Sequence, residues 1–203
     1  MPAIAGKIGT IYMSTDAAAA AFTTEAMTDS GDHTTYYITN DAKRYWDKNT
    51  AVIVYVDGTP ETAVTIQYAG GRVVFDTPLA GTEAVTVTGA SLTMAEAGGF
   101  YNWGLDMSTE MSDATTFASN GWKENLPALS EFTVSAEAYW LNGDFIDILG
   151  TEVVLALYVD EASDYRYEGF AIISSDSVSE SVNEIVMETI EFSGNGNIYY
   201  NAA

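Results

Sequence analysis

Very few side chains in this sequence could perform catalysis. There is no cysteine and a single histidine, His33, which excludes thiolate chemistry, disulfides, iron–sulfur clusters and zinc sites built on several histidines. His33 lies in the polar, turn-like run of residues 29–33, and no Gly-x-Ser-x-Gly nucleophile motif occurs anywhere in the chain. We therefore interpret His33 as an exposed turn residue.

Acidic side chains are abundant, and two kinds of site would use them. A glycoside-cleaving enzyme needs a pair of carboxylates, and Glu137, close to Tyr139 and Trp140, is the best candidate. Strand alternation puts Glu137 on the face opposite Trp140, so we interpret it as a solvated strand position. Calcium could bind residues 160–164 or 29–32, but neither run has the ligand spacing of an EF-hand. We predict no enzymatic activity, no cofactor and no metal.

The charge of the chain is strongly unbalanced. Its 203 residues carry 29 acidic and 7 basic side chains, a net charge of −22, and from Asn125 onward only Arg166 is basic. Nucleic acids and anionic membranes are bound through Lys and Arg, so both are disfavoured as partners. Two interpretations stay open, a surface that keeps the protein soluble and a surface that nucleic acid passes without adhering. Charge alone does not choose between them.

Alternation of apolar and polar residues predicts antiparallel strands. It runs over residues 131–140, 62–68 and 85–88. Residues 52–56 and 153–159 are apolar on both faces, so each needs a second layer or a neighbouring subunit over its outer face. Turn signals at Asp57-Gly58, Gly70-Gly71 and Asn195-Gly196 separate the strands. The fold class is predicted to be mainly β, an antiparallel sandwich or partly open barrel with one or two short flanking helices.

The helical signals are short. Asp16 could cap a helix over residues 17–22 that extends to about Met27, residues 39–46 could form one or two turns, and residues 142–149 are either a loop or a short helix. The acidic, serine-rich residues 176–182 are predicted to form an exposed loop. We expect a single domain over residues 1–203, with a possible hairpin-rich lobe at 45–92.

No targeting or membrane signal is apparent. The first residues, Met1 to Lys7, lack the basic stretch and apolar core of a secretory signal, and the longest apolar runs are too short to cross a bilayer. We expect a soluble protein that is not exported.

The second half of the chain contains a pattern that begins with Trp103-Gly104-Leu105-Asp106 and continues through Asp113 to Phe117. It then runs through the segment Gly121-Trp122-Lys123-Glu124-Asn125-Leu126-Pro127-Ala128-Leu129 to a strand ending at Trp140. This pattern resembles that of the major tail tube proteins of long-tailed, siphovirus-type bacteriophages. Residues 190–198 are similar to the last strand pair of the same family. Ala128 stands where the family commonly has glycine, and the match covers about residues 100–200.

This resemblance implies a structural virion protein. Family members are β-sandwiches with a flanking helix that self-assemble as hexameric rings stacked into a tube, and genomic DNA crosses the lumen during ejection without specific binding. It implies synthesis in the host bacterial cytoplasm, a place in the phage tail, and other tail proteins as partners. Ring-to-ring contacts would come from loops 39–50 and 108–121 and from the amino-terminal arm.

Aromatic residues supply candidate interface positions and also an alternative function. The candidate interface residues are Tyr45, Trp46, Phe100, Trp103, Phe117 and Trp122. Exposed aromatics and acidic turns would equally suit a carbohydrate-binding or adhesin-type β-sandwich module.

Overall fold

The computed structural model describes residues 9–15, 17–116, 119–141, 143–180, 182 and 185–201. Within them the protein is mostly β, with two antiparallel sheets, as the sequence predicted. The helical elements are η2 (Asp41–Lys43), a single 3-10 turn, and the four-residue α1 (Asp144–Asp147). No helix in the described ranges has the length and apolar character needed to cross a membrane.

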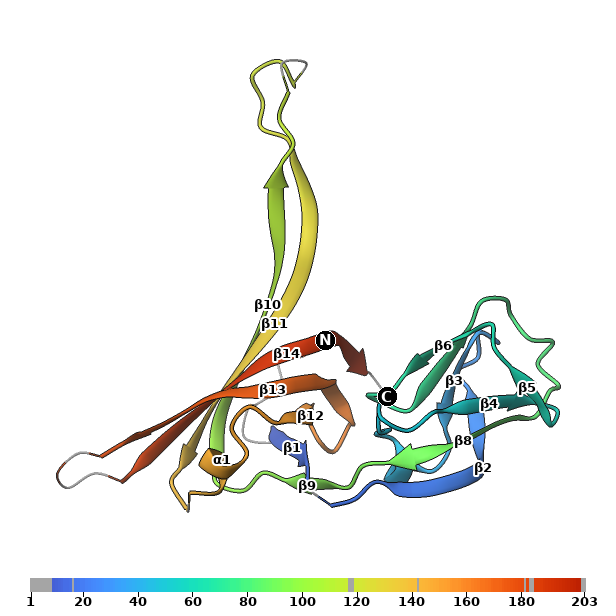
Figure 1. Cartoon of the computed structure of the whole chain (residues 1–203), viewed down its shortest axis with the longest axis horizontal. Helices are drawn as coiled ribbons and strands as arrows, with labels where there is room; N and C mark the ends of the chain where they lie inside the picture. The colour runs from blue at the N-terminus through green and yellow to red at the C-terminus, as the bar shows by residue number, and fades with distance from the viewer. Residues whose placement is uncertain are drawn as a thin grey trace. The chain divides into compact units, whose positions relative to one another are not determined.

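The strands form two seven-stranded sheets (Figure 1). In spatial order the first sheet contains β10 (Phe100–Asp113), β11 (Asn125–Tyr139), β14 (Met187–Asn201), β13 (Tyr165–Ser179), β12 (Glu152–Asp160), β1 (Thr10–Ser14) and β9 (Met94–Glu96). The second contains β5 (Thr59–Glu61), β4 (Ile53–Val56), β8 (Val85–Ser91), β2 (Ala20–Asp29), β3 (Thr35–Ile38), β7 (Arg72–Phe75) and β6 (Val64–Gln67).

The chain divides into two compact units. Unit 1 comprises residues 1–96, 154–168 and 199–203, and unit 2 comprises residues 97–153 and 169–198. The boundaries fall inside β12, β13 and β14, so each of these strands contributes residues to both units. The single domain over residues 1–203, with its lobe at 45–92, stays a prediction.

The core of unit 1 lies around Trp46. This side chain is fully buried, its ring packs against Phe22 with centroids 6.1 Å apart, and its indole N–H donates to the Lys43 carbonyl at 2.8 Å. The other buried members of this cluster are Met27, Tyr36, Ile38, Val54, Val73, Phe75, Val85 and Val87. At one end of the sheet Asp57 and Gly58 both have positive φ, which confirms the predicted two-residue hairpin between β4 and β5.

The two strands predicted to be covered on both faces differ. In β12, Val153 to Leu157 are five consecutive buried residues, so the prediction is confirmed there. In β4 the side chain of Ile53 is 42% exposed, so no second layer within the chain covers it there, and cover by a neighbouring subunit stays a prediction. The alternating strands at 62–68, 85–88 and 131–140 are confirmed as β6, β8 and β11.

The predicted helix over residues 17–27 was wrong. From residue 20 to residue 29 the chain is β2, which pairs with β8 along one edge and with β3 along the other. Alanine has the highest helix propensity, but propensity is a small free-energy term, and burial of Phe22 and Met27 between paired neighbours outweighs it. The pairing is irregular between Phe22 and Glu25, where Thr24 adopts a positive φ. The proposed cap, Asp16, lies outside the described residues.

Three further boundaries differ from the prediction or refine it. The turn predicted at Asn195-Gly196 was wrong, because β14 continues through it to Asn201, and Gly196 has φ +110°. The loop predicted at 176–182 was also wrong as far as residue 179, where β13 ends. The short turn within residues 39–46 is confirmed as η2, capped by Asn40, whose side-chain oxygen accepts from the Ala42 N–H at 3.2 Å.

The core of unit 2 comes from the alternation in β11. Phe132, Val134, Ala136 and Ala138 are buried, and Phe192 and Ile190 of β14 lie opposite Val134 and Ala136. Residue 194 must be glycine here, because a Cβ would lie 2.4 Å from the Phe132 ring.

Gly194→Ala is therefore expected to destabilise the protein by about 1–2 kcal/mol, since the ring must move out of a packed site. Urea unfolding measures the change. Gly98→Ala is the matched control, because a Cβ there would meet nothing within 4 Å. Equal stability of the two variants would contradict the packing described for Phe132.

Candidate assembly surface

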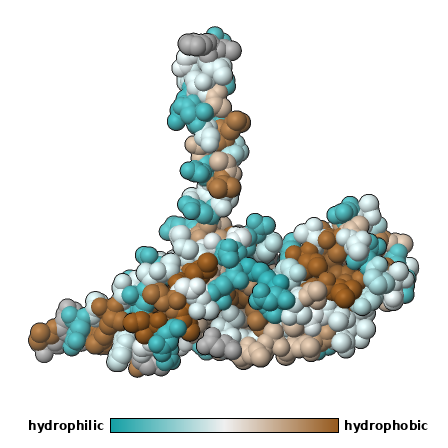
Figure 2. Space-filling model, viewed as in Figure 1, coloured by the Kyte–Doolittle hydropathy of each residue, from teal (hydrophilic) through white to brown (hydrophobic). Residues whose placement is uncertain are grey.

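The distal half of the β10–β11 hairpin has no covered side chain. We call residues 107–113 and 125–131 the arm. Every arm residue is exposed, whereas β11 alternates regularly between buried and exposed positions from Phe132 to Tyr139. Figure 1 shows the hairpin extending away from the other strands of unit 2. Because a two-stranded hairpin alone is marginally stable in water at best, the arm, on which apolar side chains are exposed (Figure 2), is a candidate surface for contact with another chain.

The arm exposes large apolar side chains. Met107 and Met111 of β10 are 59% and 60% exposed, and Leu126 and Leu129 of β11 are 60% and 77% exposed. Trp122, just before β11, is 80% exposed. In addition, β10 is the edge strand of the first sheet, with one row of backbone groups unpaired within it. An exposed edge combined with exposed apolar side chains is the usual signature of a surface that pairs with another chain.

A second surface of unit 2 is purely polar. Directly opposed pairs share one face of a sheet, and register places Asn102, Asp106 and Ser108 opposite Glu137, Thr133 and Glu131. We call this the acidic face. It comprises Asn102, Gly104, Asp106 and Ser108 of β10, Glu131, Thr133, Ser135 and Glu137 of β11, and Thr189, Glu191 and Ser193 of β14. These eleven positions include four carboxylates and no basic residue.

Hydrogen bonds hold the carboxylates of the acidic face in place. Asn102 donates to Glu137 at 2.9 Å, Ser108 donates to Glu131 at 3.1 Å, and Ser175 of β13 donates to Glu191 at 3.3 Å. Glu137 is therefore a half-buried strand residue bound by a neighbouring amide. All of these donors are uncharged, so no basic group offsets the carboxylates of this face, and the face repels phosphate groups.

The predicted interface residues fall into three environments. Tyr45 and Trp46 are buried in unit 1, 8% and 0% exposed, which gives them a role within the fold. Phe100 and Trp103 are half-buried near the base of the hairpin, where the Phe100 ring packs edge-on against Phe145 with centroids 5.8 Å apart. Trp122 is exposed, and Phe117 lies outside the described residues. Only Trp122 among the described five has most of its side chain exposed to solvent.

The turn around His33 uses its carboxylates internally. The Asp29 carboxylate accepts from the N–H groups of Gly31 and His33 at 2.9 and 3.0 Å and pairs with the His33 imidazole, and these contacts lower the pKa of Asp29. Asp32 accepts from the N–H groups of Thr34 and Thr35. His33 is exposed, as predicted. Over the described ranges, no cluster of three or more His, Cys, Asp or Glu residues is arranged to hold a metal ion.

A buried carboxyl pair in unit 2 had no sequence signal. Glu188 of β14 faces the core beside Ala138 and is only 3% exposed. One oxygen of Glu188 and one of Asp176 in β13 are buried without a hydrogen-bond partner in the described structure. Burial raises the pKa of Glu188, and the nearby carboxylates of Asp176 and Asp144 raise it further. The fold therefore favours the protonated form of Glu188.

Known proteins similar to this chain are found among solved structures, at low sequence identity. No protein-family model matches the chain, and no curated protein matches it. Among solved structures, a chain from the virion of a native gene transfer agent particle is 17% identical, with a TM-score of 0.45 over 54% of this chain and 89% of that one. A chain from the tail of an empty gene transfer agent particle, determined with C6 symmetry, is 16% identical, with a TM-score of 0.45 over 54% and 87%. Both TM-scores are under 0.5, so neither likeness supports an inference about function.

Proposed function

We propose that this protein is a non-catalytic structural subunit of a bacteriophage tail, which assembles as hexameric rings stacked into the tail tube. The observation that carries the proposal is the arm, a hairpin with no covered side chain and four large exposed apolar residues. In an isolated chain this surface would favour aggregation. In a ring or tube it is buried against the next copy, and the β10 edge gains a partner strand.

The acidic face supports the part of the proposal that concerns DNA. Carboxylates and hydroxyls without a basic residue form a surface to which a phosphate backbone does not adhere. A channel for a translocating genome needs this property, because each bound phosphate would slow its passage. The same face gives no reason to expect binding of DNA outside the channel.

The sequence pattern over residues 100–200 supports the choice of the siphovirus-type tube. It spans β10 and β11, which build the arm, and β14, which joins them in the acidic face. Hexameric order, synthesis in the host cytoplasm and contacts with other tail proteins belong to the proposal as consequences of that resemblance.

Electron microscopy of the purified protein tests this function. Negatively stained samples at increasing protein concentration are expected to contain rings or tubes with six-fold symmetry in end views. Sedimentation provides the matching measurement in solution. A protein that stays monomeric at every concentration, and also in the presence of preformed tube fragments as nuclei, would refute the proposal.

The arm variant, in which serine replaces Met107, Met111, Leu126 and Leu129 together, is expected to lose assembly and to keep the stability of the wild type. These side chains are exposed within the chain, so the fold does not depend on burying them, whereas an interface does. Sedimentation and thermal unfolding read the two effects separately. The control replaces Val178 and Ile185, which are 55% and 66% exposed outside the arm, with serine. Normal assembly of the arm variant would show that the arm is not an interface.

A further inference from the structure

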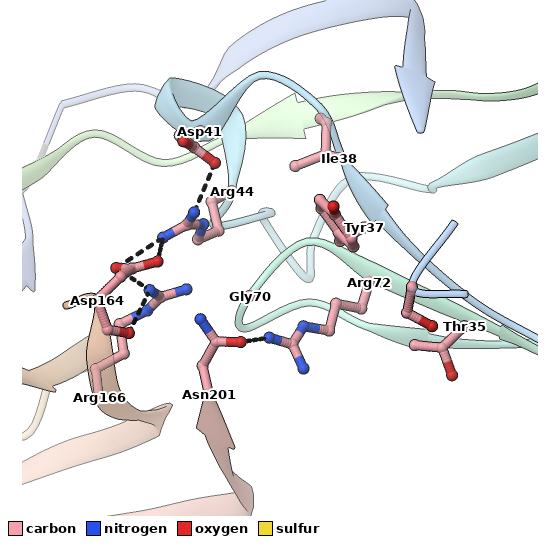
Figure 3. A pocket seen from close by; sticks show the side chains of 11 residues that line it. Thr35, Tyr37, Ile38, Asp41, Arg44, Gly70, Arg72, Asp164, Arg166 and Asn201 are labelled. Atoms are coloured by element: carbon pink, nitrogen blue, oxygen red, sulfur yellow. Dashed lines mark hydrogen bonds and ion pairs between the residues drawn. The ribbon is translucent and has the colours of Figure 1, made fainter. Parts of the chain in front are cut away.

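Unit 1 contains a cavity in which three of the seven basic residues of the chain meet. Its volume is about 520 Å³, and its basic side chains are Arg44, Arg72 and Arg166 (Figure 3). Arg44 follows η2, Arg72 begins β7, and Arg166 lies in β13. Such a cluster of arginines is unexpected in a chain with 29 acidic residues, and the three guanidinium groups differ in the carboxylates that they contact.

Arg166 and Arg44 are neutralised within the chain. Arg166 is 1% exposed, its Nε donates to Glu168 Oε2 at 2.7 Å, and its Nη1 pairs with the carboxylate of Asp164. Arg44 donates to Asp164 Oδ2 at 3.3 Å and to Asp41 Oδ1 at 2.5 Å. Three carboxylates therefore contact these two guanidinium groups, and the charges of the five groups sum to −1.

Arg72 has no carboxylate partner in the part of the chain that the structure describes. Its guanidinium donates to the side-chain oxygen of Asn201, an uncharged amide. Its backbone is fixed by pairing with Tyr37 of β3 and Gln67 of β6, so the side chain is held at the cavity wall. A guanidinium carries five N–H donors in a planar fork that matches a carboxylate. Arg72 thus has a guanidinium without a direct carboxylate contact and with unused donors at the cavity wall.

We propose that the Arg72 cavity binds a carboxylate presented by the arm of a second copy of this chain. This inference rests on the proposed function, because it names the receiving surface for the arm. Complementary charge carries it. The hairpin from residue 100 to residue 139 has six acidic residues and one basic residue, Lys123. In the described structure the carboxylates of Glu110, in the arm, and of Glu124, directly before its second strand, are exposed and have no partner, and Arg72 has no carboxylate partner.

Charge exchange between the two surfaces tests the proposal. Arg72→Glu is expected to raise the protein concentration needed for assembly by about 10- to 100-fold, the equivalent of one charged hydrogen-bonded contact. Arg72→Gln, which can still bind Asn201, is expected to weaken assembly less. Adding Glu110→Arg or Glu124→Arg to Arg72→Glu is expected to restore assembly in at least one of the two combinations. Lys48→Glu, the same charge change in unit 1 outside the cavity, serves as control.

The outcomes separate this inference from the proposed function. If wild-type protein forms no rings or tubes, both fail. If wild type and Arg72→Glu assemble equally, or if neither exchange restores assembly, this inference is overturned and the proposed function stands. Thermal unfolding of each variant confirms that a loss of assembly is not a loss of fold.

A free carboxylate is the other possible source of the same chemistry. Sodium glutarate is expected to inhibit assembly of the wild-type protein more than sodium chloride at equal ionic strength, because it competes with the arm for Arg72. If glutarate raises the melting temperature of wild type but not of Arg72→Gln, and leaves assembly unchanged, the cavity is a small-molecule site and the arm does not enter it.

Discussion

Replacing Arg166 with methionine is expected to lower the free energy of unfolding by about 3–5 kcal/mol, the range found when one member of a buried ion pair is removed. The partner left behind, Glu168, is fully buried, and one of its oxygens already has no hydrogen-bond partner in the described structure. Only Tyr45 would still donate to it, at 3.3 Å. The charge of Glu168 could not be hydrated without opening the core.

The pairing explains why Arg166 stays charged in the interior. Burial acts to lower the pKa of Arg166, and the carboxylates of Glu168 and Asp164 outweigh it, so the net pKa is raised. Burial, together with the Glu168 charge, also raises the pKa of the Tyr45 hydroxyl, which therefore remains a donor. Arg166 and Glu168 depend on each other as a pair.

A double variant is the matched control for this prediction. Arg166→Met combined with Glu168→Met removes both charges, and buried ion pairs replaced by apolar residues are often neutral in stability. We expect urea unfolding to place the double variant closer to wild type than Arg166→Met alone. If Arg166→Met lowers the free energy of unfolding by less than about 1 kcal/mol, the variant does not contain Glu168 as an unpaired buried charge.

Replacing Glu188 with glutamine is expected to stabilise the protein at pH 8 by about 1–3 kcal/mol, the usual cost of a buried polar group without a partner. In the wild type, Glu188 and Asp176 each bury an oxygen that nothing in the described structure satisfies, and Asp144 adds a third carboxyl. Glutamine removes a negative charge from this site and supplies an amide donor for Asp176.

The sign of the pH dependence follows from the raised pKa of Glu188. Because the folded protein holds this proton more tightly than the unfolded chain, the stability that Glu188 contributes is fully present below its ordinary pKa of 4.5 and is lost as the pH rises through the folded pKa. Glu188→Gln has no such proton, so the gain it gives is expected to vanish toward pH 4. Thermal unfolding from pH 4 to pH 8 measures this.

Asp144→Asn provides the control, since Asp144 is exposed and contributes least to the shift. It is expected to give a smaller change with the same sign. A stability difference between Glu188→Gln and wild type that stays constant across this pH range would contradict a raised pKa of Glu188 in the folded protein.

Local patterns predicted the regular strands and little of the assembly surface. Residues 132 to 138 alternate because one face packs on a core, and that periodicity was visible in the sequence. The arm lies in the same two strands, but its side chains are exposed on both faces, so Met107 and Leu129 follow no simple alternation. Exposure on both faces removes the alternation that packing of a single face imposes on a strand.

Pairing between distant segments caused the other misses. The alanine-rich residues 17–22 have a local preference for helix, and the pairing of β2 with β8 and β3 overrides it. The turn at Gly70-Gly71 was predictable from the sequence, but the close packing at Gly70 was not. A Cβ at that position would lie 2.2 Å from Glu168 Oε1. The Arg72 cavity likewise joins residues more than 120 positions apart in sequence, such as Arg72 and Asn201.

The position of β10 at the rim of its sheet has a consequence for the direction of growth. The strand and its arm lie in unit 2, whereas the proposed receiving cavity lies in unit 1, so each contact joins two different surfaces. Contacts of this head-to-tail kind repeat without a two-fold axis. The two ends of such a polymer would therefore be chemically distinct, one offering unfilled cavities and the other uncovered hairpins. Proteins that start and stop its elongation would have to recognise opposite ends.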